Sequence, residues 1–456
     1  MFTPLDAGKA KGMYVSAYAR YIDNPDEARK LYKRSLVVLA LSQLIAGAGF
    51  IAGLSAGALL ANQMLGINSL SGLPFVAFSL GSAVAAVLIG RISQRVGRRT
   101  GLAAGFITGG IGAAGIVLAT IITNTALFFA ALFVYGAGSA TSMQARYAGT
   151  DLARAKERAT SVGMVLVALT FGVLLAPLLT DWLQEAAISL GALPNSGVFI
   201  LAGSAYLMSG LFILIFLRPD PLLVSLQIQR AGNGRLQNKN AKLPTDGLQQ
   251  ANDGDEREQQ VKAGNSATGS NTTYRKGMVF GIVIMTAVFM VMVLIMTMTP
   301  VHMQGHGHGL MAITWIIGIH IAAMYLPSLF SGMFVDRIGK SRAAMLSGLV
   351  LAASAVLTMC APAGQMALMA VALSLLGIGW NIGFISGTTM VVDSVAQSER
   401  AKIQGIADVF IAFVGAAGGF FAGVIEAQIG FYAVCIMGLF IALATTGYAF
   451  IAGKKA

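Results

Sequence analysis

The sequence predicts an all-α membrane protein with twelve transmembrane helices in two halves of six, and with both termini in the cytoplasm. Three observations predict this fold class. The chain of 456 residues is 56% hydrophobic and only 11% charged, whereas soluble domains carry about 25% charged residues. Its apolar residues fall into twelve runs, and every Lys and Arg lies in loops on one side of these runs.

The segment 1–34, before the first apolar run, is polar and charged. It lacks the short apolar core of a cleavable signal peptide. Asn24-Pro25-Asp26-Glu27 reads as a helix start, with an Asn cap, Pro at the first position and acids in the first turn. We expect this helix to lie at the cytoplasmic membrane interface before the first span. A solvated tail is the alternative.

Each of the twelve apolar runs is long enough to cross a hydrocarbon core of about 30 Å. All 31 Lys and Arg residues lie before the first run, after the last, or at or beyond the ends of even-numbered runs, Arg146 being next to the end of the fourth. The positive-inside rule therefore places both termini in the cytoplasm. The net charge of +12 then reflects topology and attraction to anionic lipid, and it requires no nucleic-acid partner. The runs lie near 35–60, 70–90, 100–122, 125–147, 160–180, 196–217, 277–301, 312–334, 343–362, 365–392, 405–427 and 430–452.

One long polar stretch, 219–274, separates the sixth run from the seventh. It is rich in Asn, Gln, Gly, Asp and Lys, so it buries too little apolar surface to offset the entropy of ordering. We expect a flexible cytoplasmic linker between an N-terminal half, 35–218, and a C-terminal half, 275–456.

The two halves repeat each other at an offset of 242 residues. The repeat is visible in the loops after the second and eighth runs, and again after the fourth and tenth, where Glu157-Arg158-Ala159 matches Glu399-Arg400-Ala401. Two parallel repeats of six helices are typical of transporters that work by alternating access. The first pair of loops contains Gly90, Gln94, Arg95, Gly97 and Arg98, and Gly332, Asp336, Arg337, Gly339 and Lys340.

The pattern G-x-x-x-D-R-x-G-R/K in these loops resembles the signature of the major facilitator superfamily, and the resemblance covers the whole membrane portion. It implies that the loops latch neighbouring helices on the cytoplasmic face. Asp336 can accept hydrogen bonds at a helix N-terminus or pair with Arg. The first loop departs from the pattern because Gln94 replaces the Asp, so we expect a weaker latch there. The alternative is that these residues only anchor the topology and form tight turns at Gly97 and Gly339.

Ionisable residues inside the spans are few. We expect no Lys or Arg within a span, and Asp408 and Glu426 fall near the ends of the eleventh run. This pattern argues against a proton-coupled exporter of cations and against an anionic substrate held by buried Arg. Two cysteines form no disulfide framework or zinc site, and no nucleophile–base arrangement indicates an enzyme. We expect no cofactor.

Soft metal ligands cluster at the start of the second half. Met292 and Met296 in the seventh run, and His320 and Met324 in the eighth, are spaced at i and i+4 and lie at similar depth. This pattern resembles the CcoA-like copper importers, a bacterial branch of the superfamily, which implies Cu(I) as the cargo and not as a cofactor. Thioether and imidazole suit Cu(I), but Met is also a common packing residue. A periplasmic loop adds His302, Met303, His306 and His308, for ion capture or as a plain solvated turn.

The sequence leaves two other functions open. One is transport of a small, mostly neutral organic compound, such as a vitamin, metabolite or drug, with Trp315, Tyr325, Trp380 and Asn381 lining a cavity. The other is a non-transporting receptor or scaffold on a transporter fold. In each case we expect a multi-pass protein of the bacterial inner membrane. The direction of transport and the coupling ion stay open. A monomer is the working expectation, although no sequence feature fixes the oligomeric state.

Overall fold

The structure, a computed structural model, describes residues 20–50, 57, 60, 63–64, 73–175, 177–193, 195–241, 253–307, 310–361 and 365–453. Over this part of the chain it is helical, with short turns and no strand. Its elements are α2 (Pro25–Phe50), α4 (Leu73–Val96), α5 (Arg98–Ile121), α6 (Thr125–Ala148), the 3-10 helix η2 (Ala155–Glu157), α7 (Arg158–Leu175), α8 (Pro177–Ser189), α9 (Gly197–Phe216), α10 (Pro221–Ala241), α11 (Asp253–Gly305), α12 (Leu310–Tyr325), α13 (Ser328–Ile338), α14 (Lys340–Cys360), α15 (Met366–Asp393), α16 (Arg400–Gln428) and α17 (Phe431–Gly453).

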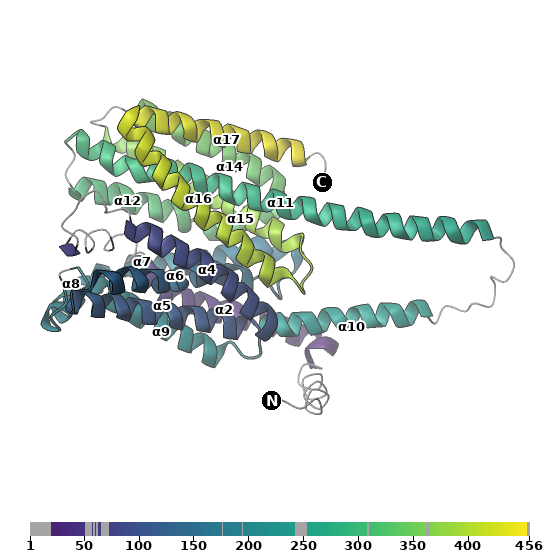
Figure 1. Cartoon of the computed structure of the whole chain (residues 1–456). Helices are drawn as coiled ribbons and strands as arrows, with labels where there is room; N and C mark the ends of the chain where they lie inside the picture. The colour runs from purple at the N-terminus through teal and green to yellow at the C-terminus, as the bar shows by residue number, and fades with distance from the viewer. Residues whose placement is uncertain are drawn as a thin grey trace.

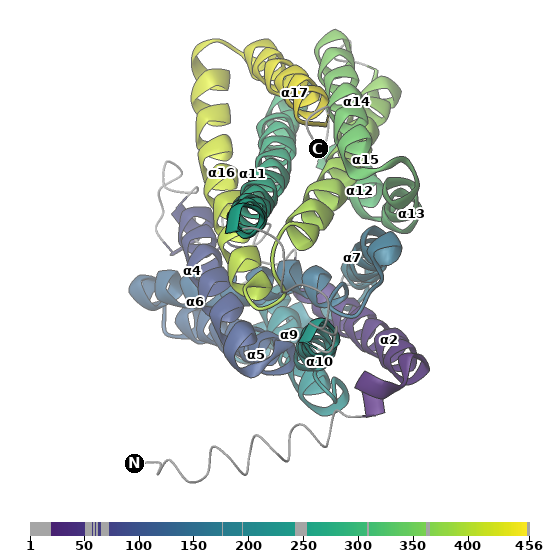
Figure 2. The ribbon, with the colours of Figure 1, turned by 90° about the vertical axis from the view of Figure 1, so that its right-hand side faces the viewer.

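The helices form two groups that lie side by side (Figure 1 and Figure 2). In the first group α5 packs against α6 and α9, α4 packs against α6, and α2 packs against α7 and α9. In the second, α14 packs against α15 and α17, and α11 packs against α15, α16 and α17, while α12 and α13 lie on α15. The two groups meet mainly where α16 lies on α4 and where α13 lies on α7. This arrangement confirms the predicted all-α membrane fold.

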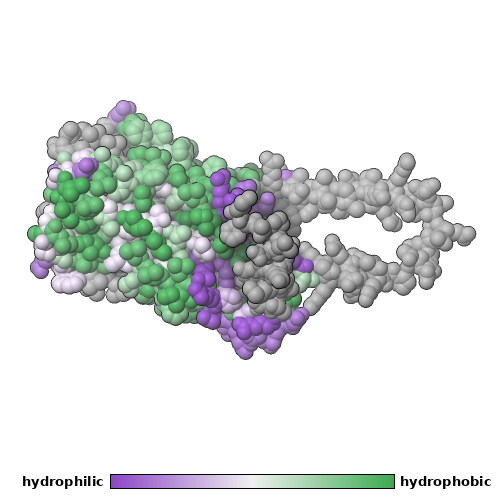
Figure 3. Space-filling model, turned by 60° about the horizontal axis from the view of Figure 1, so that its bottom comes forward, coloured by the Kyte–Doolittle hydropathy of each residue, from purple (hydrophilic) through white to green (hydrophobic). Residues whose placement is uncertain are grey.

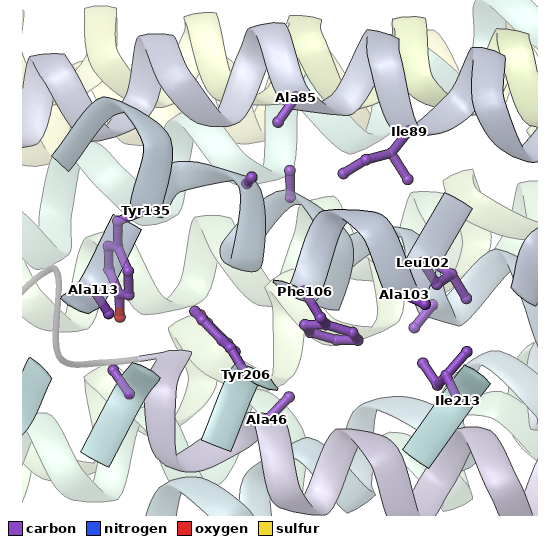
Figure 4. Close-up of a cluster of buried hydrophobic side chains, with 14 of the residues drawn as sticks. Ala46, Ala85, Ile89, Leu102, Ala103, Phe106, Ala113, Tyr135, Tyr206 and Ile213 are labelled. Atoms are coloured by element: carbon purple, nitrogen blue, oxygen red, sulfur yellow. The ribbon is translucent and has the colours of Figure 1, made fainter. Parts of the chain in front are cut away.

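Each group has an apolar core. Figure 4 shows part of the first core, in which the Tyr206 ring lies between Tyr135 and Phe106, 5.6 and 5.7 Å away between ring centroids. The second core is built on α11, α14 and α15. Helix α7 contributes Val165 to the first core and the next residue, Leu166, to the second. It therefore joins the two groups.

Large apolar side chains cover the outside of the bundle, as expected for a surface in contact with lipid. Ile111 on α5 and Phe440 on α17 are 60% and 68% exposed. Hydrophilic residues on the face in Figure 3 gather near the end from which α10 and α11 extend. We call this the linker end. Helix α2 begins and α17 ends toward the linker end (Figure 1), in agreement with an even number of spans. Its assignment to the cytoplasm stays a prediction.

The structure has a helix start at Pro25, as predicted, but among the described residues no break separates this helix from the first span; its interfacial position stays a prediction. Asn24 Oδ1 accepts hydrogen bonds from the backbone N–H groups of Asp26, at 3.0 Å, and Glu27, at 3.3 Å. From there α2 continues without a break to Phe50. No Gly or Pro follows Pro25 before the apolar run begins, so nothing in the sequence turns the helix at the membrane surface.

The predicted eighth span, 312–334, is divided in the structure. Helix α12 ends at Tyr325 and α13 begins at Ser328, because Pro327 lacks the N–H group needed to continue the helical ladder. Within the described residues, eleven helices are long and apolar enough to cross a membrane, and the two pieces around Pro327 count as one. Helix α7 lies in the predicted fifth span.

The expected flexible linker, 219–274, contains more helix than predicted. Helix α10 covers Pro221–Ala241, and α11 begins at Asp253, well before the membrane-spanning part of that helix. Helical residues adjoining an existing helix avoid the cost of nucleation, and Arg, Leu, Lys and Gln in this stretch favour helix. The prediction, which was based on low hydrophobicity, did not consider that the neighbouring helices extend into this segment. Its flexibility stays a prediction. The exact limits of the two halves also stay predictions.

Candidate functional site: a charged gate between the two halves

The four predicted metal ligands lie on two helices that scarcely touch each other. Met292 and Met296 are partly buried on α11, whereas His320 and Met324 are buried on α12. Helix α15 packs against both helices, and His320 Nδ1 donates to the Leu373 carbonyl of α15 at 2.9 Å. The other ring nitrogen of His320 is buried with no hydrogen-bond partner among the described residues. Met324 belongs to the second core and Met292 and Met296 pack against it. The metal role of the four side chains stays a prediction.

The predicted capture loop is partly helical and partly packed. Helix α11 runs through His302 and Met303, and Met303 is buried in the second core. The His302 ring stacks on Phe431, with centroids 4.1 Å apart, and His306 is exposed. Partial burial lowers the pKa of His302, and His306 lowers it further. His308 lies outside the described residues.

Three of the four cavity candidates are buried on α12 and α15. Tyr325 meets Trp380 edge-on, with centroids 5.5 Å apart, and Trp380 stacks on Phe384 at 4.5 Å and 19° between ring planes. The Trp380 indole N–H is buried with no hydrogen-bond partner among the described residues. Trp315, by contrast, is 68% exposed. We call Tyr325, Trp380 and Phe384 the aromatic stack.

Asn381, the fourth candidate, holds three helices together. Its amide N–H groups donate to the Met324 carbonyl and to the Ser328 hydroxyl, both at 2.7 Å, and the Ser331 hydroxyl donates to its side-chain oxygen. Because both ends of the amide are used, Asn381 fixes α15 against α12 and α13 on either side of the Pro327 break.

The loop after α13 contacts the opposite half at the linker end. Asp336 Oδ1 accepts from the backbone N–H of Ala159 at 3.2 Å, and Oδ2 accepts from the Thr160 N–H at 2.9 Å and hydroxyl at 2.8 Å. These groups belong to the first turn of α7, where free N–H groups and the helix dipole favour a carboxylate. This is the geometry expected of a latch, although the latch role itself stays a proposal.

The matching loop after α4 makes the corresponding contact through an uncharged side-chain amide. Gln94 Oε1 accepts from the backbone N–H of Ala401 at 3.0 Å, in the first turn of α16. Asp336 is 242 residues after Gln94, and Ala401 is 242 residues after Ala159, so the two contacts are equivalent under the repeat.

Glycines let the helices approach closely at both contacts. A Cβ on Gly90 would lie 2.7 Å from the Ala401 carbonyl oxygen, and a Cβ on Gly332 would lie 2.6 Å from the Ala159 carbonyl oxygen. Two further loop glycines, Gly97 and Gly339, have φ of 107° and 89°, in the left-handed region that favours glycine. Gly90 and Gly332 therefore allow close packing of helices, and Gly97 and Gly339 allow the chain to turn.

Buried charges surround the first contact. Arg98 Nε donates to Asp151 Oδ2 at 2.8 Å, and both side chains are fully buried. The same guanidinium donates across the interface to Gln404 of α16. Arg95, the other basic motif residue of this loop, is exposed. The motif thus contains one basic residue inside the interface and one outside it.

The second contact has the equivalent charges. Lys340 and Arg158 both pair with Asp393, and the Arg158 pair crosses between the two halves. Arg337, like its counterpart in the first loop, is exposed. We call the two latch contacts, together with these two clusters of charge, the linker-end gate.

A third charged contact crosses between the halves. Arg146 of α6 donates to Asp408 Oδ1 of α16 at 2.6 Å, with side-chain exposures of 0% and 6%. The Tyr147 hydroxyl lies 3.4 Å from the same oxygen. The Arg146 guanidinium also lies 4.5 Å from the centroid of the Phe384 ring, so the pair adjoins the aromatic stack. The expectation that no Arg lies within a span disagrees with the structure, because Arg146 lies within the candidate membrane span Thr125–Ala148.

The sequence model of the Major Facilitator Superfamily matches residues 39–419 and, in a second match, 281–454. The chain belongs to the major facilitator superfamily. The predicted resemblance to this superfamily is confirmed, and the protein is a transporter and not an enzyme.

Relatives within the superfamily bear on the substrate. The chain is 44% identical over 443 residues to an uncharacterized MFS-type transporter, YdeG, of Bacillus subtilis, covering 97% of each chain. It is 26% identical over 398 residues to the riboflavin transporter RfnT of Brucella anthropi, covering 86% of this chain and 88% of that protein. The fold is similar to that of the human organic anion transporter MFSD10 (TM-score 0.68, 17% identity, 92% and 99% coverage). These relatives do not support the copper-importer branch.

Sequence reasoning missed the Arg146–Asp408 pair for a definable reason. Each residue lies near the end of its apolar run, so each alone reads as a loop or boundary residue. The offset of 242 gives no help, because the positions equivalent to Arg146 and Asp408 are Thr388 and Leu166. The available signal was the position of Asp408 three residues inside the eleventh run, where a lone carboxylate needs a partner.

Proposed function

We propose that this chain is a secondary transporter that moves a small, mostly neutral organic compound with planar rings across the bacterial plasma membrane by alternating access. Its membership of the superfamily supports the transport mechanism, and its bacterial relatives support the membrane. The similarity to a riboflavin transporter supports an organic cargo. A vitamin or metabolite of this kind takes the place of copper(I) as the expected substrate.

The aromatic stack is the observation that carries the substrate class. Trp380 and Phe384 present parallel rings, and the Arg146 guanidinium lies over Phe384. Stacked aromatic side chains with one charged group are suited to a planar, polar-edged molecule. The free indole N–H of Trp380 adds a donor that a carbonyl-bearing ring can satisfy. In the structure the stack is covered, so substrate reaches it only after the halves separate.

The linker-end gate supports alternating access. Both of its contacts join a helix end of one half to a helix N-terminus of the other, and they are equivalent under the repeat. Two equivalent contacts can release together when the halves rock about the axis that relates them. We infer that Asp336 and Gln94 act as latches and that this conformation has the linker end closed.

Uptake of labelled riboflavin and labelled copper by a riboflavin-requiring bacterium carrying the gene tests this proposal. We expect riboflavin uptake above the level of the empty vector, and no gain in copper. Trp380→Ala should reduce uptake at least about tenfold if the ring contributes 1.4 kcal/mol or more of binding, while Trp380→Phe retains more. Trp182→Ala, at a tryptophan 70% exposed on α8, is the matched control. Copper uptake without any gain in riboflavin uptake would overturn the proposal.

A further inference from the structure

The Arg146–Asp408 ion pair is buried and connects the two halves of the protein. It joins α6 of the first half to α16 of the second, and both residues lie within candidate membrane spans. At about 1.5 Å per residue, Asp408 lies roughly 12 Å along α16 from its start at Arg400. Any movement that separates the halves at the linker end must also separate these two charges.

The surroundings leave Asp408 incompletely satisfied. Its Oδ1 receives Arg146 and Tyr147, but its Oδ2 is buried with no hydrogen-bond partner among the described residues. The charged and titratable groups acting on it are Arg146 and Tyr147 of α6 and, at longer range, Arg98 of α5. A carboxylate with one free buried oxygen has an atom available for a proton.

Separation of the pair has unequal consequences for its two members. Arg146 keeps contacts on its own half, to the Met143 carbonyl and the Tyr147 hydroxyl, and its guanidinium stays charged at any ordinary pH. Asp408 would lose its counter-ion while still inside the bundle. A buried carboxylate without a partner is strongly unfavourable, and a proton removes its charge.

We propose that Asp408 is the proton-coupling residue of this transporter. In the closed state it is ionised and paired with Arg146. A proton from water at one membrane face binds its carboxylate and forms an O–H bond, the ion pair breaks, and α16 separates from α6. The proton returns to water when the O–H bond breaks and the pair forms again. One proton is thus exchanged in each opening and closing of the linker-end gate. This inference deepens the proposed transport function and rests on it, but its test needs no substrate.

The test measures the gate directly. Nitroxide labels are placed on cysteines at Val96, which ends α4 and is 54% exposed, and at Ser398, which is exposed just before α16. The native Cys360 and Cys435 are replaced by serine. Pulsed electron paramagnetic resonance on the full chain in lipid then gives the label separation between about pH 5 and about pH 9.

The labelled chain with Asp408 intact should open as pH falls. Its ratio of open to closed molecules should change by up to about tenfold per pH unit where Asp408 titrates in one state only. Asp408→Asn, which mimics the protonated carboxyl, should be mostly open and insensitive to pH. Asp408→Glu keeps a carboxylate and should keep the response with a moved midpoint, which also provides a test if the Asn variant does not fold.

Asp220→Asn is the matched control. Asp220 is a buried carboxylate that accepts from the backbone of Arg99 and Leu222, all in the first half and its linker helix, so its loss should leave the pH response in place. A pH-independent gate with Asp408 intact, or an unchanged pH response in Asp408→Asn, would overturn the proposal. Absence of riboflavin transport would instead count against the proposed substrate and leave this result standing.

Discussion

At the residue scale, one substitution distinguishes the two halves of the linker-end gate. Asp336 accepts three hydrogen bonds at the start of α7, whereas Gln94 accepts one at the start of α16. Hydrogen bonds to a carboxylate are roughly twice as strong as neutral ones, and the helix dipole adds to them. The gate is therefore held more firmly on the side of α7 and α13.

Removing the charge of Asp336 should weaken the gate more than removing the amide of Gln94. We expect Asp336→Asn to slow transport severalfold, because the loss of a charge-assisted contact costs about 1 kcal/mol or more. Gln94→Ala should reduce it by much less. Initial uptake rates at matched membrane levels measure both, and equal effects would show that the asymmetry has no functional meaning.

The two basic residues of the first loop should differ in their effect on stability. Arg98→Ala leaves Asp151 buried without its partner, which should cost about 3–5 kcal/mol of unfolding free energy. Arg95→Ala removes an exposed charge and should change stability by less than about 0.5 kcal/mol. Thermal unfolding in detergent separates the two. Similar melting temperatures would contradict the buried ion pair.

The contacts of the gate loops could be predicted from the sequence, but the pairing of side chains inside the helix bundle could not. Asp336 could be predicted as an acceptor at a helix N-terminus because motif and repeat place it beside a helix start. His320 and Met292 could be placed at one depth, but depth does not reveal that α15 packs against both of their helices. Arg146 and Asp408 were missed because pairing between distant helices leaves no local pattern.

At the element scale, α13 lies close to α7 and α4 lies close to α16, and we propose that these two contacts hold the closed state. Glycines at these crossings allow backbone to meet backbone. The helices themselves follow from apolar runs of membrane length, so their existence was predictable. Their limits were not: α2 starts ten residues before the predicted span because no breaker stops it, and Pro327 divides the eighth span.

A side chain on Gly332 should open the linker-end gate. In Gly332→Val the added Cβ would meet the Ala159 carbonyl oxygen at 2.6 Å, which the backbone can relieve only by moving apart. We expect the open population measured with the Val96 and Ser398 labels to rise at least about tenfold, equivalent to 1.4 kcal/mol. Gly447→Val, at a glycine of α17 with no atom within 4 Å of the added Cβ, should leave the population unchanged. Equal label distances in both variants would contradict the close contact.

At the scale of the whole molecule, the offset of 242 residues relates the gate contacts of one half to those of the other. This symmetry was visible in the sequence and is repeated in the contacts of Asp336 and Gln94. The buried pair between α6 and α16 breaks the symmetry, and so does the aromatic stack on α12 and α15. The two features on which the proposed functions rest therefore lie at positions that the repeat does not duplicate.

The distribution of Lys and Arg predicts that the linker end faces the cytoplasm. A reporter enzyme active only in the periplasm should be inactive when fused after Ala456, and a reporter active only in the cytoplasm should be active there. The positive-inside rule supplies the reason. Activity of the periplasmic reporter would reverse the topology and the side on which the gate closes.

The most direct test of the account is transport with the linker-end gate held shut. Cysteines replace Val96 and Ser398 in a chain without Cys360 and Cys435, and a short, reducible crosslinker joins them across the gate in reconstituted liposomes. We predict that crosslinking stops uptake of labelled riboflavin, that a reductant restores it, and that either cysteine alone has no effect. Undiminished uptake with the crosslink in place would contradict alternating access through this gate.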